Sequence, residues 1–446
     1  MNVHTRADVH RTLNRRAAAI VVLAGTLPLG CSGPVEPASP DEEMRQQFAL
    51  GPLGAVHYPD DNQRSEQRIA LGRLLFFDPI LGGERDVACG TCHHPDFHFA
   101  DGRQFAAGVS GVGLGPDRHV GVSSVSGDSI TTAARNTPTI LNTAFALIEA
   151  TDGSGNTRSL APLFWDGRAI GLEGQALVPL GARVEMRGDA FPDIERNEGY
   201  LPGTDEAAES TVDSILARIR NVPEYVTLFG NAFPDQPPNE TDLVNRSTLS
   251  RALAAYEREL VTLNSPFDRW LSGEDAALDD LQRHGLELFF TKAKCSVCHR
   301  GAVLSTFRFM VTGVPQEGPG KRLIPGDDLG REEHTLDPRD RYKFRVPTLR
   351  NVEITAPYMH SGVFASLEDV VRFYNSGSQP RHPKVRDDVL DPTLRQPLGL
   401  TDDEVHALVS FLRSLTDPGT QIDQTLRTVP STVPSGLVPV YGVAGY

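Results

Sequence analysis

Residues 89–93 read CGTCH, and residues 295–299 read CSVCH. The chain has five cysteines, so these two motifs use every cysteine except Cys31. In each motif the cysteines stand nearly one helical turn apart, and a histidine follows at once. This spacing is typical of c-type haem attachment, in which both thiols form thioethers with the vinyl groups and the adjacent imidazole ligates the iron. The predicted attachment residues of the two haem c groups are Cys89, Cys92, His93, Cys295, Cys298 and His299.

Two other uses of paired cysteines fit less well. Structural zinc sites prefer CxxC pairs that lie close together in sequence, whereas about 200 residues separate these two pairs. Disulfides suit an exported chain, but they give no reason for the histidine after each pair.

The composition sets the broad class. A length of 446 residues with 39% hydrophobic content allows two or three soluble globular domains. The formal net charge of -15 argues against a nucleic-acid binder. It allows attraction to a basic partner, although such a balance more often serves solubility.

The N-terminus has the pattern of an export signal. Arginines precede the apolar stretch AAAIVVLAGTLPLG, which ends at Cys31. The stretch predicts a signal peptide over residues 1–30 and a flexible tether over 31–55. Its end resembles a bacterial lipoprotein cleavage site, which predicts a lipid anchor on Cys31, and ordinary secretion is the alternative. No other run is apolar enough to span a membrane, so we expect an exported, periplasmic protein.

A weak internal repeat surrounds the two motifs. The stretches IALGRLLFFDPILGGERDVACGTCH and LQRHGLELFFTKAKCSVCH each run a glycine, a leucine-rich helical pattern and a Phe-Phe pair into the CxxCH motif. The repeat predicts two related haem domains, at 56–240 and 241–416, separated by the Pro-rich break at 234–242. Thr401 is the expected N-cap of a closing helix, and residues 417–446 form a loosely attached tail. Because β-branched alternation is scarce, we expect a mostly α-helical fold.

The motifs together resemble one family, the bacterial di-haem cytochrome c peroxidases, which include the MauG group. The resemblance covers roughly residues 65–416. It implies two cytochrome c-like domains that face each other, with a calcium ion and a tryptophan between the haems. The stretches that carry it, in family order, are LGRLLFFDP, RNTPTILN, FWDGRAIGLEGQALVPL, RVEM, FRVPTLRNVEITAPYMHSG and SLEDVVRFYNSG.

The resemblance makes the first haem the peroxide site. The family pattern places a glutamine and a glutamate ten residues apart on the open face of that haem, and the matching steps here run from Trp165 to Gln175 to Glu185. Glu185 is then the proton shuttle, Gln175 the orienting hydrogen-bond donor and Trp165 the aromatic bridge between haems. Without the resemblance, Glu185 reads as a surface carboxylate and Trp165 as a core residue.

Some relatives cap the peroxide face with a histidine. The matching position here is Asp128, and the nearest histidine on that stretch is His119. We therefore favour a five-coordinate first haem, as in MauG, with capping by His119 as the alternative.

The second haem is expected to transfer electrons. The peroxidases place a methionine ligand fourteen residues after the histidine of the PYxH motif, and that count from His360 gives Tyr374. MauG uses tyrosine there, and a phenolate lowers the potential of ferric iron. Met359 and Met310 are the rival ligands, although methionine at such a spot is usually packing.

The resemblance also implies a calcium ion. Asn136 would offer its amide oxygen, and Thr355 and Pro357 their backbone carbonyls. The alternative without a metal is that Asn136 caps a turn and the TAP stretch is only a bend. The segment NTAFALIEATDGSGNTRSLAPLF is longer than the family leads us to expect, which leaves open whether it alters access to the first haem or contacts a partner.

Three functions follow from these residues. The first is a peroxidase that reduces hydrogen peroxide with electrons from a small cytochrome c or cupredoxin. The second is a MauG-like enzyme that uses peroxide to oxidise residues of a partner protein. The third is a non-catalytic electron carrier, against which Gln175 and Glu185 argue. The sequence leaves the oligomeric state open, a homodimer included.

Overall fold

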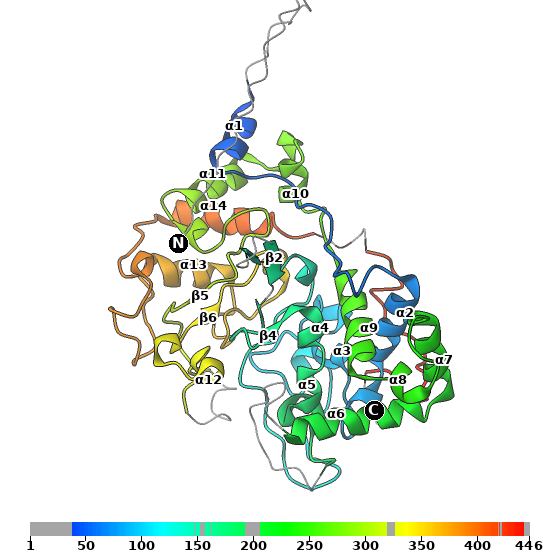
Figure 1. Ribbon diagram of the computed structural model, residues 1–446. Coiled ribbons are helices and arrows are strands. Elements are labelled where there is room, and N and C mark those ends of the chain that lie inside the picture. Colours follow the sequence, from blue (N-terminus) through cyan, green and yellow to red (C-terminus); the bar gives the residue numbers. More distant parts are fainter. Residues whose placement is uncertain are drawn as a thin grey trace, which may run out of the picture.

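The computed structural model describes residues 38–146, 148–151, 157–160, 162–191, 206–318, 326–417, 419 and 422–440. Figure 1 shows a mostly helical molecule, which confirms the predicted fold class. The α-helices are α1 (Pro40–Gln47), α2 (Glu66–Phe77), α3 (Cys89–Cys92), α4 (Gly171–Gln175), α5 (Val178–Gly181), α6 (Glu206–Arg220), α7 (Pro223–Ala232), α8 (Glu240–Leu243), α9 (Arg246–Arg258), α10 (Pro266–Leu271), α11 (Asp280–Phe290), α12 (Glu332–Thr335), α13 (Leu367–Asn375) and α14 (Asp402–Arg413).

Sheet structure is limited to short antiparallel pairs in the described part of the chain. Within the described ranges, no helix combines the length and the apolar character needed to cross a membrane. The predicted signal peptide and Cys31 lie outside the described residues and stay predictions. The paired strands are β1 (Ile148–Thr151) with β2 (Thr157–Leu160), β3 (Pro162–Leu163) with β4 (Ala169–Ile170), and β5 (Phe309–Met310) with β6 (Phe344–Arg345).

The two largest hydrophobic cores of the described residues each contain two helices that cross in an equivalent way. In the first core α2 packs on α9, and a Cβ added to Gly72 would lie 1.9 Å from the carbonyl oxygen of Ala252. In the second, α11 packs on α14, and a Cβ added to Gly285 would lie 2.0 Å from the carbonyl oxygen of Ala407. Each glycine thus allows a backbone approach that a side chain would block. The repeat seen in the sequence therefore corresponds to a repeated packing arrangement.

The position of α9 differs from the domain limits expected from the sequence. Leu249 and Leu253 of α9 are buried in the first core, whereas the sequence predicts that residues after 240 belong to the second domain. These leucines are four residues apart, so they lie on one face of α9, in the core that residues of α2 also form. Thr401 accepts a hydrogen bond from the amide of Glu404, which confirms the predicted N-cap of α14.

The N-terminal segment packs on the second core. The indole nitrogen of Trp270 donates to Asp41 of α1 at 2.5 Å, and the Phe48 ring stacks on Phe290 with centroids 4.6 Å apart. Figure 1 shows α1 beside α10 and α11, far along the chain. The described part of the expected tether thus contains a docked helix, because its acidic and aromatic residues find partners there.

The C-terminal segment packs on the first core. The amide of Val440 donates to the carbonyl of Phe77 at 2.8 Å, and Thr91 donates to the carbonyl of Val440 at 2.6 Å. Ser435 donates to the carboxylate of Asp78 at 2.6 Å. Residues 422–440, drawn toward red in Figure 1, run beside α2 and α7. This segment is held by buried hydrogen bonds, in contrast to the loose tail expected from its prolines and glycines.

Candidate functional site

The first CxxCH motif forms α3 and presents His93 at its end. The Nδ1 atom of His93 lies 3.0 Å from the carbonyl oxygen of Phe99. Phe99 has a φ of 57°, a left-handed conformation that turns the loop back toward the imidazole. The carbonyl fixes the ring so that Nδ1 carries the proton and Nε2 keeps its lone pair, as in metal-ligating histidines.

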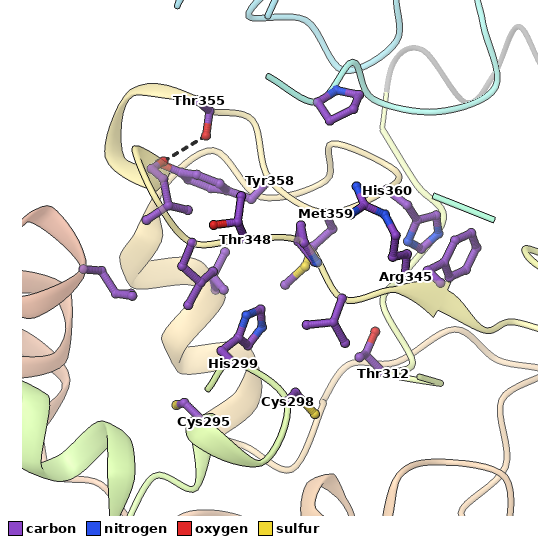
Figure 2. A pocket seen from close by; sticks show the side chains of 18 of the residues that line it. Cys295, Cys298, His299, Thr312, Arg345, Thr348, Thr355, Tyr358, Met359 and His360 are labelled. Carbon is purple, nitrogen blue, oxygen red and sulfur yellow. Dashed lines mark hydrogen bonds between the residues drawn. The ribbon is translucent and has the colours of Figure 1, made fainter. Parts of the chain in front are cut away.

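The second motif repeats this arrangement. The Nδ1 atom of His299 lies 3.0 Å from the carbonyl oxygen of Leu304, whose φ is 52°. Burial lowers the pKa of His299 to about 4, so the ring is neutral at pH 7. Figure 2 shows Cys295, Cys298 and His299 gathered at one wall of a cavity.

The residues of both motifs fit a covalently bound haem. All four motif cysteines are free thiols. The cavity at the second motif has walls that are mostly apolar, as a porphyrin ring requires, and its lining includes both thiols and the anchored imidazole. The first motif has the same paired thiols and the same carbonyl-anchored imidazole.

The candidate distal ligands of the second haem meet in this cavity. Tyr374 of α13, Met359 and Met310 of β5 all line it. The hydroxyl of Tyr374 lies near the sulfur of Met359, and burial raises the pKa of Tyr374. Figure 2 shows the Met359 side chain extending into the space beside His299.

Glu185 lies in a single π-helical turn (Arg183–Arg187) close to the first motif. Burial raises the pKa of Cys92 to about 12, and the negative charges of Asp101 and Glu185 add to this effect. Burial likewise raises the pKa of Glu185, while the guanidinium of Arg168, 3.7 Å away, opposes the rise. The structure therefore places a half-buried carboxyl with a raised pKa near the first CxxCH motif.

A buried ion network continues from Arg168. Arg168 pairs with Asp166 at 3.0 Å, and Asp166 pairs with Arg135 at 2.5 Å. Arg135 in turn contacts Asp328 at 2.6 Å. Although burial opposes it, the two arginines lower the pKa of Asp166 to about 2. Arg168 is thus held firmly by one carboxylate and shared with Glu185.

Trp165 and Gln175, the other two residues predicted for the peroxide site, lie close in sequence to Asp166 and Arg168 of this network. The indole nitrogen of Trp165 donates to the carbonyl of Asn136 at 2.9 Å, and its ring lines the cavity of the second motif. Trp165 also meets the ring of His360 edge-on, with centroids 6.4 Å apart. Gln175 is the half-buried last residue of α4.

The predicted calcium residues border the same cavity. Asn136, Thr355 and Pro357 all line it. The side-chain amide of Asn136 donates to the carbonyl of Arg103 at 2.7 Å, and Thr355 donates to the carbonyl of Val352 at 3.2 Å (Figure 2). No cluster of three or more His, Cys, Asp or Glu side chains forms a metal site among the described residues. The predicted site therefore depends on amide and carbonyl oxygens.

His119, the alternative cap of the first haem, is exposed. Its Nδ1 atom lies 3.4 Å from the carbonyl oxygen of Asp117 in its own turn. Asp128, at the position where relatives place a histidine, is exposed as well.

One carboxyl near the first motif was missed by sequence reasoning. Glu257 of α9 is buried, and burial raises its pKa to about 8. When it is ionised, its negative charge raises the pKa of the Cys89 thiol. The sequence does indicate its burial: Glu257 is four residues after Leu253, and this spacing places it on the core face of the helix.

Comparison with known proteins gives the family. A family profile described as di-haem cytochrome c peroxidase matches residues 66–276. Cytochrome-c peroxidase IdrP1 of Pseudomonas sp. (strain SCT) is 32% identical over 403 residues, covering 84% of this chain and 88% of that protein. The chain belongs to the di-haem cytochrome c peroxidase family. Family membership confirms the predicted oxidoreductase class and implies two haem c groups.

Other relatives in the family carry different names. The methylamine utilization protein MauG of Methylorubrum extorquens is 30% identical, covering 90% of this chain and 93% of that protein. Cytochrome c551 peroxidase of Pseudomonas aeruginosa is 32% identical, covering 81% and 82%. The crystal structure of a MauG-like protein associated with microbial copper homeostasis matches with a TM-score of 0.61 at 27% identity, covering 84% of this chain and 96% of that one.

Proposed function

We propose that this protein reduces hydrogen peroxide with electrons from a small redox protein, a cytochrome c or a cupredoxin. Peroxide binds at the first haem site, and electrons enter at the second. The observation that carries this proposal is Glu185, a carboxyl with a raised pKa beside the first CxxCH motif. O–O cleavage requires an acid–base group at the peroxide site, and a carboxyl with a raised pKa suits that role.

The side chains act on protons. Bound haem supplies the iron that takes up peroxide and the redox chemistry that cleaves it. Glu185 accepts a proton from one peroxide oxygen and returns it to the other, and Gln175 orients the oxygens by donating a hydrogen bond. A raised pKa makes the Glu185 carboxylate a stronger base than an ordinary glutamate. Arg168 limits that rise, because its charge favours the ionised carboxyl.

Other chain features complete the proposal. Trp165 bridges the two sites, Tyr374 ligates the second iron, and Asn136, Thr355 and Pro357 hold a calcium ion between the halves. The N-terminal signal exports the protein to the periplasm, with Cys31 as the lipid anchor. The assignments of Trp165, Tyr374, Asn136, Thr355 and Pro357 are supported by the family pattern and by the positions of these residues around the cavity, whereas the signal and the anchor rest on the sequence alone.

Peroxide-dependent oxidation of reduced cytochrome c tests the function. We expect Glu185→Gln to lower kcat about 100-fold or more, the usual contribution of a positioned acid–base group. Glu66→Gln, which changes an exposed carboxyl of the same charge, is the matched control. Undiminished turnover in the Glu185 variant would remove the proton-transfer role.

A second candidate is oxidation of residues on a partner protein. It is favoured by Tyr374, which stands where the peroxidases are expected to have methionine. Peroxide added without a donor distinguishes the two functions. A changed haem spectrum that persists for minutes and decays on adding a protein substrate favours protein oxidation, whereas rapid turnover with reduced cytochrome c favours peroxide reduction.

A further inference from the structure

A single hydroxyl connects the loops that orient both haem-ligating histidines. The Oγ1 atom of Thr262 accepts one hydrogen bond from the side-chain amide of Asn142 at 2.7 Å and another from that of Asn351 at 2.8 Å. The backbone amide of Thr262 donates to Asn142 Oδ1 at 2.8 Å. All three residues are at most 2% exposed, so water does not substitute for these bonds.

The two asparagines occupy equivalent places. Asn142 has a φ of 61° and Asn351 a φ of 59°, and each begins a short 3-10 turn. The backbone amide of Asn142 donates to Leu260 at 2.9 Å, and that of Asn351 donates to Leu415 at 3.0 Å. These carbonyls follow the equivalent helices α9 and α14. Thr262 therefore lies where the two halves of the internal repeat meet.

Each asparagine ends a loop that controls a proximal histidine. In the first half, Thr139 donates to the carbonyl of His98 at 2.6 Å, and the next carbonyl, that of Phe99, is the one that fixes His93. The carbonyl of Phe99 also accepts from the amide of Ile140 at 3.3 Å.

The second half repeats this path. Thr348 donates to the carbonyl of Val303 at 2.6 Å, and the next carbonyl, that of Leu304, is the one that fixes His299. A continuous path of short backbone segments and hydrogen bonds thus runs from one imidazole through Thr262 to the other.

We propose that Thr262 is a positioning residue for both haem sites, whose hydroxyl holds the two asparagine-ended loops and thereby the orientation of His93 and His299. Its removal leaves two buried amide donors without their acceptor, so both loops shift to find new partners. The orientation and hydrogen bonding of a proximal histidine set the properties of the iron it ligates. The proposal rests on two bound haems and not on which oxidation they perform.

The test compares Thr262→Val with Thr262→Ser in the holoprotein. Valine keeps the shape and removes the acceptor, and serine restores it. Haem content is measured by pyridine haemochrome in every variant. The readouts are the ferric electron paramagnetic resonance spectrum, the iron–histidine stretching frequency of the reduced protein and the midpoint potentials of both haems. We expect valine to shift the signals of both haems and serine to restore them.

Thr248→Val is the matched control. Thr248 is a fully buried threonine of α9 that donates to the carbonyl of Leu243 at 2.8 Å, and it belongs to the capping box of a helix that carries no haem ligand. Its loss should lower the unfolding temperature and leave the haem signals unchanged. Unshifted haem signals in Thr262→Val, a shift at one haem alone, or an equal shift in Thr248→Val would each overturn the proposal.

A second variant covers the case in which Thr262→Val does not fold. Asn351→Ser removes the bond between the second loop and Thr262, because serine is too short to reach Thr262, and it also removes the acceptor of the Asp417 amide. We expect it to shift the signals of the haem held by His299. Unchanged signals at that haem would overturn the proposal. None of these readouts depends on turnover. If the parent protein has no peroxidase activity, the proposed function is wrong, but the test of Thr262 is unaffected.

Discussion

The hydroxyl of Tyr374 lies 3.9 Å from the sulfur of Met359 inside the cavity of the second CxxCH motif. Both side chains line the cavity that a haem held by His299 would occupy, so either residue would be in a position to supply the second iron ligand. A phenolate favours ferric iron, whereas a thioether raises the potential. We expect Tyr374→Phe to raise the midpoint potential of the second haem and to change its ferric spectrum, as measured by spectroelectrochemistry.

Met359→Leu is the matched test of the rival ligand. It keeps the volume of the side chain within a methylene and removes the sulfur. If Tyr374 is the ligand, this variant retains the parent's ferric spectrum and potential. If Met359→Leu loses the parent's ferric signal and Tyr374→Phe keeps it, the ligand of the second iron is Met359 and not Tyr374.

Arg168 should set the pH dependence of the reaction with peroxide. Its positive charge lowers the pKa of Glu185 against the effect of burial, so Arg168→Gln should raise that pKa further. Because the carboxylate is the base, the rate rises as pH rises through this pKa. The rising limb therefore moves to higher pH in the variant, which stopped-flow mixing with peroxide measures at several pH values.

Two further variants test whether this shift of the pH dependence comes from Glu185. Arg64→Gln removes an exposed guanidinium that pairs with Glu66 and Glu259, and it should leave the limb in place. Glu185→Gln should abolish the limb. A limb that stays where it is in Arg168→Gln would show that another group controls the proton.

Glu257 should make the fold less stable as pH rises. Its pKa in the folded protein is about 8 against 4.5 for an ordinary glutamate, so the folded state binds the proton more tightly than the unfolded state. The stabilisation is complete below the ordinary value and is lost as pH rises toward 8, at a slope of about 1.4 kcal/mol per pH unit.

Glu257→Gln should remove this slope. Denaturant unfolding of parent and variant between about pH 5 and pH 8 measures the difference in free energy of unfolding. The variant gains relative to the parent as pH rises. Parallel curves for the two proteins would mean that the carboxyl stays ionised when folded.

The glycines at the two helix crossings should tolerate no side chain. In Gly285→Ala the new Cβ would lie 2.0 Å from a backbone oxygen of α14, and a backbone carbonyl cannot rotate away. We expect destabilisation by about 3 kcal/mol or more, at the upper end of overpacking effects, and a lower unfolding temperature.

Gly174→Ala is the control for this prediction. Gly174 lies in α4 with nothing within 4 Å of an added Cβ. Alanine there should stabilise slightly, by about 0.5–1 kcal/mol, because it reduces the entropy lost on folding. A Gly285 variant as stable as this control would mean that α11 and α14 can separate without loss.

The sequence predicts the residues whose chemistry depends on short spacing. The CxxCH motifs, the N-cap Thr401 and the glycine-containing repeat are local patterns; the structure confirms the N-cap and the close helix packing at both glycines. Arg168 could not be assigned in the same way, because its contact with Glu185 depends on how two separate segments fold together. The docking of α1 and of residues 422–440 has the same cause, since both depend on partners more than 200 positions away.

The N-terminal helix α1 packs on the second core, and the C-terminal segment packs on the first core. This arrangement has a consequence for folding. Residues 422–440 complete the hydrophobic interior around α2, although they are the last of the described residues to leave the ribosome. The first half therefore has an incomplete core until the C-terminal segment docks on it. A fragment cut after α9 would expose the apolar residues that Ile422 and Val440 cover, so we expect it to be less stable than the same region within the whole chain.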